Sequence, residues 1–448
     1  MASNTVFRMG VAAGVSLRTG AIEQVTPRDA ELLWLSRRMP TDQFLLFGFD
    51  GPGPDRTALP AFVADRVAGV GDLRLRLAEV PGGLDYPYWV PRIAPAVDVL
   101  EHELAPPSWP TLLAMVGGLL ASRVDPRSVP WRLHVFREVA GVPECVGPAT
   151  VVVLQITHAL ADGRRASAIA RALFGPPGAA ARLPRAPSRP RMAARAAVRT
   201  PARQLATIAL GVQALRAYRR FGEPAAAVDA PLSPLNRPTS DPAHIAATIV
   251  CPVAALRVPG CTVTTTVLAA VGPILQECWP AHSQWAAEVT VAARVPGPAR
   301  NNFRNVGIDL RIDELDAGRR RQAIGSALRA AAQPPEHPLR RAQQRVRRVL
   351  PAPVLRREVA AYPLDQVPPT VTGNTVVSSV HRGPADLRLG AAPVRFTAGF
   401  PALSPVMGLT HGIYGLGDTV AVGLHARAGL VDLEWYADRL RATLLGAR

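Results

Sequence analysis

The sequence predicts an α/β protein of two domains, in which helices flank mixed β-sheets. The first observation is length, because 448 residues exceed what one ordinary hydrophobic core organises. The second is a hydrophobic content of 48%, which is ample for large buried sheets. The third is that strand-like and helix-like segments are mixed in both halves of the chain. We therefore expect two α/β domains that meet at a cleft.

The clearest element is an apolar run that leads directly into a histidine motif. Residues Val151–Ile156 are β-branched and nearly all apolar, which is typical of a strand covered on both faces. His158 follows where this strand ends, and Asp162 and Gly163 form a tight turn before a helical pattern over Arg164–Phe174. A histidine at a strand end can accept a proton from a hydroxyl or an amine. The alternative is a histidine that only caps the strand and bonds a backbone carbonyl.

A linker divides the chain after this helix. Residues 175–178 end the helix, and residues 179–201 mix Arg, Ala and Pro without apolar periodicity, which indicates an exposed crossover. Residues 1–20 contain a short apolar patch but no clear cleavage site, so we do not interpret them as a signal peptide. We expect an N-terminal extension at 1–20, an N-terminal domain at 21–178, a basic Pro/Arg-rich crossover at 179–234 and a C-terminal domain at 235–448.

The crossover contains an amphipathic segment at Gln204–Arg220. Leu205, Ile208, Val212 and Leu215 share one helical face, and arginines lie mainly at the two ends of the segment. This pattern is typical of a basic helix at a lipid interface. A helix packed on its own protein with solvated arginines explains the pattern equally well.

The second half again mixes helices and strands. The pattern predicts helices at Val263–Leu275, Leu315–Ala332 and Asp432–Leu445, and strands at Glu288–Arg294, Val306–Leu310, Thr375–Val380 and Val420–His425. A strongly basic run covers His337–Arg348. Such a run is usually a solvated helix face, and the alternative is a role in holding phosphates or lipid headgroups.

Composition argues against several classes of function. The cysteines lack metal-ligand spacing and the density of a disulfide framework, which indicates buried thiols in a reducing cytosol. The net charge of +17 is compatible with nucleic acid. However, aromatic content is only 5% and no nucleic-acid-binding motif is present, so an anionic lipid surface or a phosphate-bearing ligand explains the charge better. No stretch approaches the length of a transmembrane helix, so we expect a cytoplasmic protein.

Several short segments match, in order and spacing, the motifs of a known protein family. Thr26–Ala30 looks like a Ser-Pro-x-Asp opening, and Leu84–Val90 looks like Pro-x-Trp-Val. Val124–Trp131 is similar to Leu-Asp-Arg-x-x-Pro-Leu-Trp, Ser233–Asn236 to Thr-x-Leu-Asn, and Gly373–Pro384 to a late Asn-Val-Pro-Gly-Pro strand. Together with the histidine motif, these segments resemble the bacterial wax ester synthase/diacylglycerol acyltransferase family, within the CoA-dependent acyltransferase superfamily. The resemblance covers nearly the whole chain.

The resemblance implies a two-domain CoA-dependent acyltransferase fold with the active site in the cleft between the domains. It implies transfer of a fatty acyl group from acyl-CoA to diacylglycerol or a long-chain alcohol, with acyl-CoA as co-substrate and no cofactor or metal. His158 would be the general base, and no covalent acyl-enzyme is needed. Asp162 would be structural, because its counterpart in the superfamily fixes the loop through a buried ion pair, for which Arg294 is one possible partner. Gly163 would permit the tight backbone.

The chain also departs from the family pattern. Thr157 replaces the first of two adjacent histidines, while the second, which the family uses as base, is kept. Thr264 and Thr265 replace an Asn-Asp pair at the start of a central helix, and Ser379 and His381 replace Asn and Pro in the late strand. These changes put substrate choice, and activity itself, in question.

The donor that would stabilise an oxyanion is less well defined. Thr264, Thr265, Asn374 and Ser379 are candidates for oxyanion or substrate contacts, because they lie in segments that match family motifs. Ordinary structural hydrogen bonding is the alternative for each.

Two further functions stay open. One is a catalytically weak homologue that binds lipid or a partner enzyme, and the other is an acyltransferase for a specialised lipid or natural product. The expected partners are acyl-CoA, a lipid alcohol or diacylglycerol, and an anionic membrane or lipid-droplet surface, but not nucleic acid. The expected location is the cytoplasm, with a peripheral position on the inner membrane or on lipid inclusions as the alternative.

Overall fold

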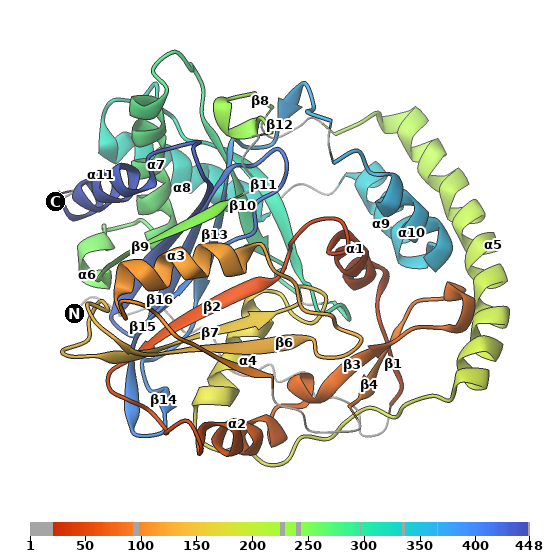
Figure 1. Ribbon diagram of the computed structural model, residues 1–448. Coiled ribbons are helices and arrows are strands. Elements are labelled where there is room, and N and C mark those ends of the chain that lie inside the picture. The colour runs from red at the N-terminus through yellow and green to blue at the C-terminus, as the bar shows by residue number, and fades with distance from the viewer. Residues whose placement is uncertain are drawn as a thin grey trace, which may run out of the picture.

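A computed structural model describes residues 21–92, 98–224, 229–238, 243–295, 297–333, 337–364 and 366–446. The expected N-terminal extension at 1–20 lies outside these residues. Within them, two six-stranded sheets organise the chain, and helices flank both sheets (Figure 1). The predicted fold class, two mixed α/β units, is therefore confirmed.

Both large sheets contain parallel and antiparallel neighbours. The first has the order β14 (Arg388–Leu389), β15 (Ala392–Gly399), β2 (Gln43–Phe49), β7 (Ala149–Ile156), β6 (Trp131–Val139) and β5 (Val99–His102), with β5 and β6 parallel. The second has the order β11 (Phe303–Asp309), β10 (Ala286–Ala292), β13 (Thr375–His381), β16 (Leu409–Leu416), β17 (Thr419–Arg427) and β9 (His244–Pro252), with β13 parallel to both of its neighbours. Two small sheets join β1 (Glu23–Gln24), β4 (Tyr88–Pro91) and β3 (Leu75–Ala78), and β12 (Thr370–Val371) with β8 (Ala230–Pro231).

Both halves of the chain contribute helices. The first half contributes α1 (Pro27–Leu35), α2 (Leu59–Ala68), α3 (Trp109–Leu120) and α4 (Gly163–Phe174). The second half contributes α6 (Val253–Leu256), α7 (Val263–Cys278), α8 (Ala317–Ala332), α9 (Pro338–Val349), α10 (Ala352–Ala361) and α11 (Leu433–Gly446). Short 3₁₀ helices occur at Gly71–Arg74, Pro81–Gly83 and Pro234–Asn236. No helix among the described residues is both long enough and apolar enough to span a membrane.

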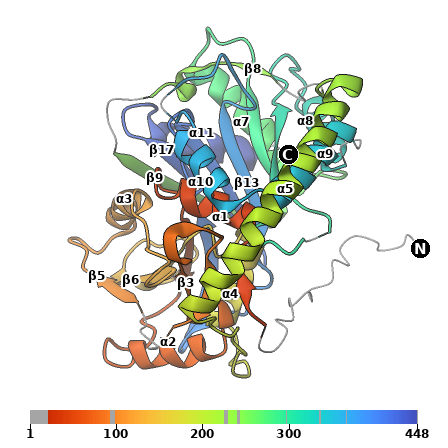
Figure 2. The same ribbon diagram turned by 90° about the vertical axis from the view of Figure 1, so that its right-hand side faces the viewer.

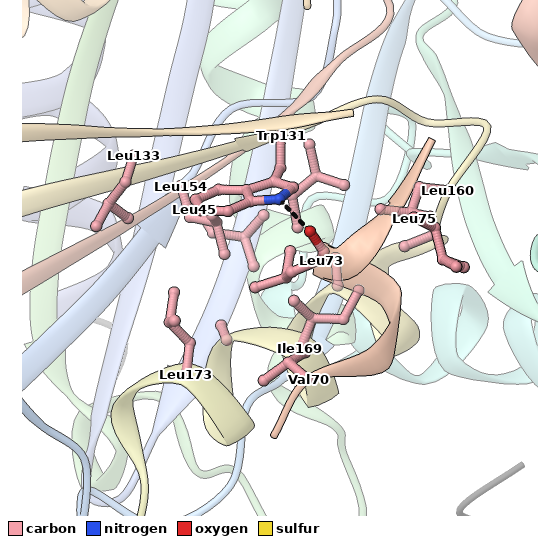
Figure 3. Packing of buried hydrophobic residues seen from close by; sticks show 14 of the residues in the cluster. Leu45, Val70, Leu73, Leu75, Trp131, Leu133, Leu154, Leu160, Ile169 and Leu173 are labelled. Atoms are coloured by element: carbon pink, nitrogen blue, oxygen red, sulfur yellow. Dashed lines mark hydrogen bonds between the residues drawn. The ribbon is translucent and has the colours of Figure 1, made fainter. Parts of the chain in front are cut away.

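The central strand β7 is fully buried, which confirms the strand predicted from its apolar run. Antiparallel pairing with β2 and β6 satisfies its backbone on both edges. One face contributes Val152 and Leu154 to a core shared with α1, α2 and α4. Figure 3 shows Trp131 in this core, where its indole Nε1 donates a hydrogen bond to the Leu73 carbonyl at 2.8 Å. The core therefore fixes the end of β7, from which His158 emerges.

The second half also contributes to the first sheet. Strand β15 pairs antiparallel with β2, and the Thr397 hydroxyl donates to the Leu46 carbonyl at 2.8 Å. From the second half, helix α10 also packs on α1, and its Leu355 and Val359 are part of the first core. These contacts of β15 and α10 hold the two halves of the chain together.

The crossover contains a single 33-residue helix, α5 (Arg189–Phe221), which begins earlier than the predicted helical segment. The Ala- and Arg-rich stretch before Gln204 lacks an apolar stripe, but both residue types favour helix strongly. Pro201 lies inside this helix. The helix lies along α9 and packs on it (Figure 2). Arg203 forms an ion pair of 3.0 Å with Asp85.

Candidate active site

A cavity of about 1880 Å³ lies between the two halves of the chain. Its wall includes parts of α1, β2 and α4 from the first half and of β10, β11 and β13 from the second. His158, Asp162 and Gly163 border it, which agrees with the expected cleft. Much of the remaining wall is apolar, with Leu32, Leu35, Leu355, Val359, Val367, Phe400, Leu403 and Met407.

His158 is partly buried in the short turn between β7 and α4. The preceding Thr157 N–H donates to the Pro130 carbonyl at 3.0 Å, and Leu160 N–H donates to the Thr157 carbonyl at 3.0 Å, so the backbone on both sides is held. The imidazole lies against the Phe303 ring, with 5.4 Å between ring centroids. The histidine thus has a fixed position at the cavity wall.

The side chain of Asn301 determines which imidazole nitrogen carries the proton. Its Nδ2 donates to the His158 carbonyl at 2.8 Å and to Asp29 Oδ1 at 2.9 Å, and both partners are acceptors. Asn301 Oδ1 therefore faces His158 Nδ1, at 2.8 Å, and can only accept. His158 Nδ1 must carry the hydrogen, so Nε2 of the neutral ring keeps its lone pair. Within the described residues, Nε2 has no hydrogen-bond partner, which leaves it available as a base.

The electrostatic environment favours this neutral form. Burial lowers the pKa of His158 below its ordinary value, although hydrogen bonds to its own backbone and to Asn301 and the charge of Asp162 act in the opposite direction. The imidazole is therefore unprotonated near neutral pH, as a general base requires.

Asp29 anchors the segment that carries Asn301. Its two carboxylate oxygens accept from the Arg300 and Asn301 backbone N–H groups, each at 3.0 Å. The Thr26 hydroxyl also donates to Asp29 at 2.7 Å, at the N-terminus of α1. The sequence had marked Thr26–Ala30 only as a motif segment and had not singled out Asn301. The structure connects them as a chain from Asp29 through Asn301 to His158.

Asp162 has a structural set of contacts, but the suggested ion pair with Arg294 is wrong. Its Oδ1 accepts from the Arg165 N–H at 2.9 Å and caps α4, and its Oδ2 accepts from the Asn302 N–H at 2.9 Å. Strand β10 ends at Ala292, so Arg294 lies beyond it and borders the cavity instead. Two backbone N–H groups satisfy the carboxylate in place of a guanidinium, and they tie α4 to the segment that holds Asn301.

The ion pairs near this loop involve other residues. Arg300 is 4% exposed and bonds both Glu23, at 2.9 Å, and Asp72, at 2.9 Å. Arg165 also binds Asp72, through two hydrogen bonds of 2.8 and 2.9 Å. This network links α4 to the segment before β11. The buried ion pairs near the loop therefore join Arg165 and Arg300 to Asp72, and do not involve the expected pair of Asp162 and Arg294.

Gly163 allows the two halves to approach closely. A Cβ at this position would lie 3.1 Å from Val380 Cγ2 of β13, which is tighter than ordinary contact. The glycine therefore brings the first turn of α4 against the second sheet beside the histidine. A side chain there would push the two walls of the cavity apart.

Thr157 packs away from the cavity. It is 1% exposed, and its hydroxyl has no hydrogen-bond partner among the described residues. We expect Thr157→Val, which has nearly the same shape, to leave kcat unchanged and to raise the free energy of unfolding by up to about 1–3 kcal/mol, because it removes a buried unpaired hydroxyl. Urea denaturation and initial rates measure the two effects. A folded variant with a large loss of kcat would contradict this and assign the hydroxyl a part in the reaction.

The four candidate oxyanion contacts fall into two groups. Ser379 borders the cavity, and the Thr264 hydroxyl donates to its Oγ at 2.8 Å. Thr265 is buried at the start of α7, where its hydroxyl bonds that of Thr262 at 2.8 Å. Asn374 is fully buried and bonds Ala286 N–H, the Pro231 carbonyl and Asn236. The structure thus brings Ser379 to the cavity, places Thr264 in a hydrogen bond with it, and directs Thr265 and Asn374 into structural bonds.

Comparison with solved structures gives several matches over nearly the whole chain. The wax ester synthase/diacylglycerol acyltransferase from Marinobacter aquaeolei VT8 matches with a TM-score of 0.61 and 19% identity, covering 94% of this chain and 98% of that chain. A starter condensation domain of rhizomide synthetase, in complex with C8-CoA and Leu-SNAC, matches at 0.55 and 12%, covering 95% and 93%. The first condensation domain of the calcium-dependent antibiotic synthetase, in complex with a substrate analogue, matches at 0.56 and 16%, covering 96% of both chains.

Neither protein-family models nor curated protein sequences give a match to the chain. At identities of 19% or less, the likeness to solved structures establishes the fold: the two-domain fold of CoA-dependent acyltransferases and condensation domains. Among the described residues, no group of three or more His, Cys, Asp or Glu side chains is arranged to hold a metal ion.

Proposed function

We propose that the protein is an acyl-CoA-dependent O-acyltransferase that transfers a fatty acyl group to diacylglycerol or a long-chain alcohol. The observation that carries the proposal is the position of His158 at the wall of a large, mainly apolar cavity, with an Nε2 that bonds to none of the described residues. A cavity of about 1880 Å³ exceeds the range of roughly 300–1,000 Å³ that is usual for small ligands. A long acyl chain and a lipid acceptor would use that space.

The reaction follows from the position of the base. His158 Nε2 takes the proton of the acceptor hydroxyl while its oxygen attacks the thioester carbonyl carbon. The tetrahedral intermediate then expels the CoA thiolate as the carbon–sulfur bond breaks, and the protonated imidazole returns the proton to that sulfur. The products are the ester and free CoA. Asn301 supports both steps, because its Oδ1 continues to accept the Nδ1 hydrogen throughout.

Ser379 is the donor we propose for the oxyanion. Because the Thr264 hydroxyl donates to Ser379 Oγ, the Ser379 hydrogen is free to point elsewhere, and the residue borders the cavity. A hydroxyl held in this way can donate to the developing negative charge. Thr264 acts as a positioning residue, and Thr265 and Asn374 keep structural roles.

Acceptor-dependent release of CoA tests the proposal. Purified protein is mixed with palmitoyl-CoA and hexadecanol, dioleoylglycerol or hexadecylamine, and the free thiol is measured. We expect release with one or both alcohols that exceeds the release without acceptor. Preference for the amine would favour amide formation, and no release with any acceptor would favour the non-catalytic homologue.

A lipid surface is the partner we propose for the outer face of α5. Val198, Leu205, Ile208, Val212 and Leu215 are between 44% and 73% exposed and form a stripe opposite the side that packs on the protein. Figure 2 shows α5 running along the outside of the molecule beside α9. Both helices contain several arginines and no acidic residue. Apolar contact with added positive charge suits an anionic membrane or lipid droplet.

Vesicle binding provides the test of this surface. Replacing Arg216, Arg219 and Arg220 with Gln should weaken binding to phosphatidylglycerol-containing vesicles by on the order of 10²-fold at low salt, since each basic residue near such a surface contributes about 1 kcal/mol. Co-sedimentation at increasing salt measures the effect, which should shrink as salt screens the charges. The control replaces Arg257, Arg388 and Arg441 with Gln and should bind as wild type does. Equal binding of wild type to neutral and anionic vesicles would reject the electrostatic part.

A further inference from the structure

Arg382 is a buried cation at the wall of the cavity. It follows β13, is 3% exposed, and borders the same cavity as His158. Its guanidinium lies over the Tyr414 ring, 4.1 Å from the centroid, and 5.5 Å from the centroid of Phe47. The side chain is therefore held between the two sheets.

The described partners of this guanidinium are all neutral. Nη1 donates to the Thr397 hydroxyl and, at 2.8 Å, to the Ala398 carbonyl. Nε is buried without a hydrogen-bond partner, and Nη2 bonds to no described residue. Burial lowers the pKa of Arg382 to about 10, so the group is still charged near neutral pH.

Arg300 is a second buried arginine in this fold, and its partners differ from those of Arg382. Arg300 is 4% exposed, but it pairs with the carboxylates of Glu23 and Asp72. A buried charge is costly unless an opposite charge and hydrogen bonds compensate it. Among the described residues, Arg382 lacks such a carboxylate, although it borders a cavity that a ligand can enter.

We propose that Arg382 binds a carboxylate of the substrate inside the cavity, with Nη2 as the first donor. The proposal rests on the acyltransferase function above and narrows its substrate to one that carries a carboxylate in addition to the reacting group. Tyr414, whose ring lies against the guanidinium, also borders the cavity, and the Ser378 side chain hydrogen-bonds to Tyr414. Since Gly163 meets Val380, two residues before Arg382, this subsite adjoins the His158 loop.

Equilibrium binding tests the subsite without requiring turnover. Dialysis with radiolabelled dodecanoate and dodecanol should give tighter binding of the carboxylate to wild type, by about 10- to 100-fold for a charge-assisted hydrogen bond that the alcohol lacks. Arg382→Gln should abolish this preference, and Arg382→Lys should keep part of it. The matched control is Arg427→Gln: Arg427 also has a buried, unpaired Nε and bonds one carbonyl, Ser404 at 2.8 Å, but it is not part of the cavity wall.

Two results would overturn the proposal: no preference for dodecanoate in wild type, or an undiminished preference in folded Arg382→Gln. If neither Arg382 variant folds, a fatty acid with a diazirine beside its carboxylate should label residues 376–384 or 409–416 of wild type, and labelling elsewhere would count against the site.

Turnover then identifies which substrate carries the carboxylate. One arm compares 12-hydroxydodecanoate with dodecanol as acceptor, and the other compares a carboxylate-terminated acyl-CoA with lauroyl-CoA as donor. An Arg382-dependent preference in either arm supports the subsite and shows whether the acceptor or the donor carries the carboxylate. Turnover without such a preference in both arms contradicts the subsite. An intact binding preference without any turnover would instead contradict the acyltransferase function.

Discussion

His158→Ala should reduce acceptor-dependent CoA release by about 10²–10⁴-fold, the usual contribution of a positioned general base. The loss should appear in kcat, while binding of acyl-CoA stays close to that of wild type. The fold should survive, because His158 is only partly buried and water from the cavity can replace it as partner of Asn301. Initial rates and thermal denaturation measure both effects.

His381→Ala is the matched control for this variant. His381 also borders the cavity but is exposed, and its side chain has one described hydrogen bond, in which Nδ1 accepts from the Gly383 N–H at 3.2 Å. Its removal should change kcat little. Equal losses in both variants, or no loss in His158→Ala, would contradict the role of His158 as base.

The pH dependence of wild type adds an independent check on the same group. Only the neutral imidazole can accept the proton, so kcat should rise with pH as His158 loses its own proton. Because burial lowers its pKa, the midpoint of this rise should lie below the ordinary value of 6.5, with a level rate above it.

Asp162→Asn should lower both stability and activity. An asparagine can still cap α4 through its oxygen, but its amide nitrogen then faces the Asn302 N–H, so a charge-assisted hydrogen bond is replaced by two opposed donors. We expect a loss of about 1.5–3 kcal/mol in the free energy of unfolding, typical of a hydrogen bond to a charged group. This is less than the roughly 3–5 kcal/mol expected for a broken buried ion pair, because Asp162 forms no ion pair with any described residue. The rate should fall too, because Asn302 adjoins Asn301.

Asp316→Asn provides the comparison for Asp162. Asp316 also caps a helix, α8, through the Arg319 N–H at 2.7 Å, but it is exposed and bridges no second segment. Asp and Asn are nearly equivalent caps, so its cost should be a few tenths of a kcal/mol at most. Urea denaturation compares the two variants. Full stability of Asp162→Asn with a selective loss of turnover would indicate a direct catalytic role instead.

The local features of the site could be predicted because they depend on neighbouring residues. The apolar run Val151–Ile156 forms a buried strand, His158 follows it, and Asp162 lies at the turn into the next helix, all of which short-range patterns encode. The position of His158 beside a cavity between the two halves is likewise as expected.

Long-range features could not be predicted from one sequence. Asn301 meets His158 across 143 residues, and neither its spacing nor its flanking residues indicated that contact. The ion pair suggested between Asp162 and Arg294 is wrong for the same reason. A backbone N–H group binds the carboxylate in place of an arginine, and the composition of a sequence does not show this. The pairing of β15 with β2 also joins distant segments, and strand periodicity does not encode which sheet a strand joins.

The prediction of where helix α5 begins was wrong for a different reason. In its first part the two side chains that are buried against the protein, Met192 and Ala196, are too few to form an apolar stripe, so the segment resembled an exposed linker. The burial of Met192 and Ala196, helix propensity and the ion pair of Arg203 with Asp85 stabilise it. In contrast, the apolar residues that suggested a helix at Gln204–Arg220 face outward, away from the protein.

Mass analysis of the product tests the central claim most directly. Wild type and His158→Ala are incubated with palmitoyl-CoA and the acceptor that gives the highest CoA release, and the lipid extract is analysed for the palmitoyl ester. The account predicts one ester per CoA released by wild type, and ester in His158→Ala reduced by at least about 10²-fold. Free palmitate without ester, or equal ester from both proteins, would contradict acyl transfer by His158.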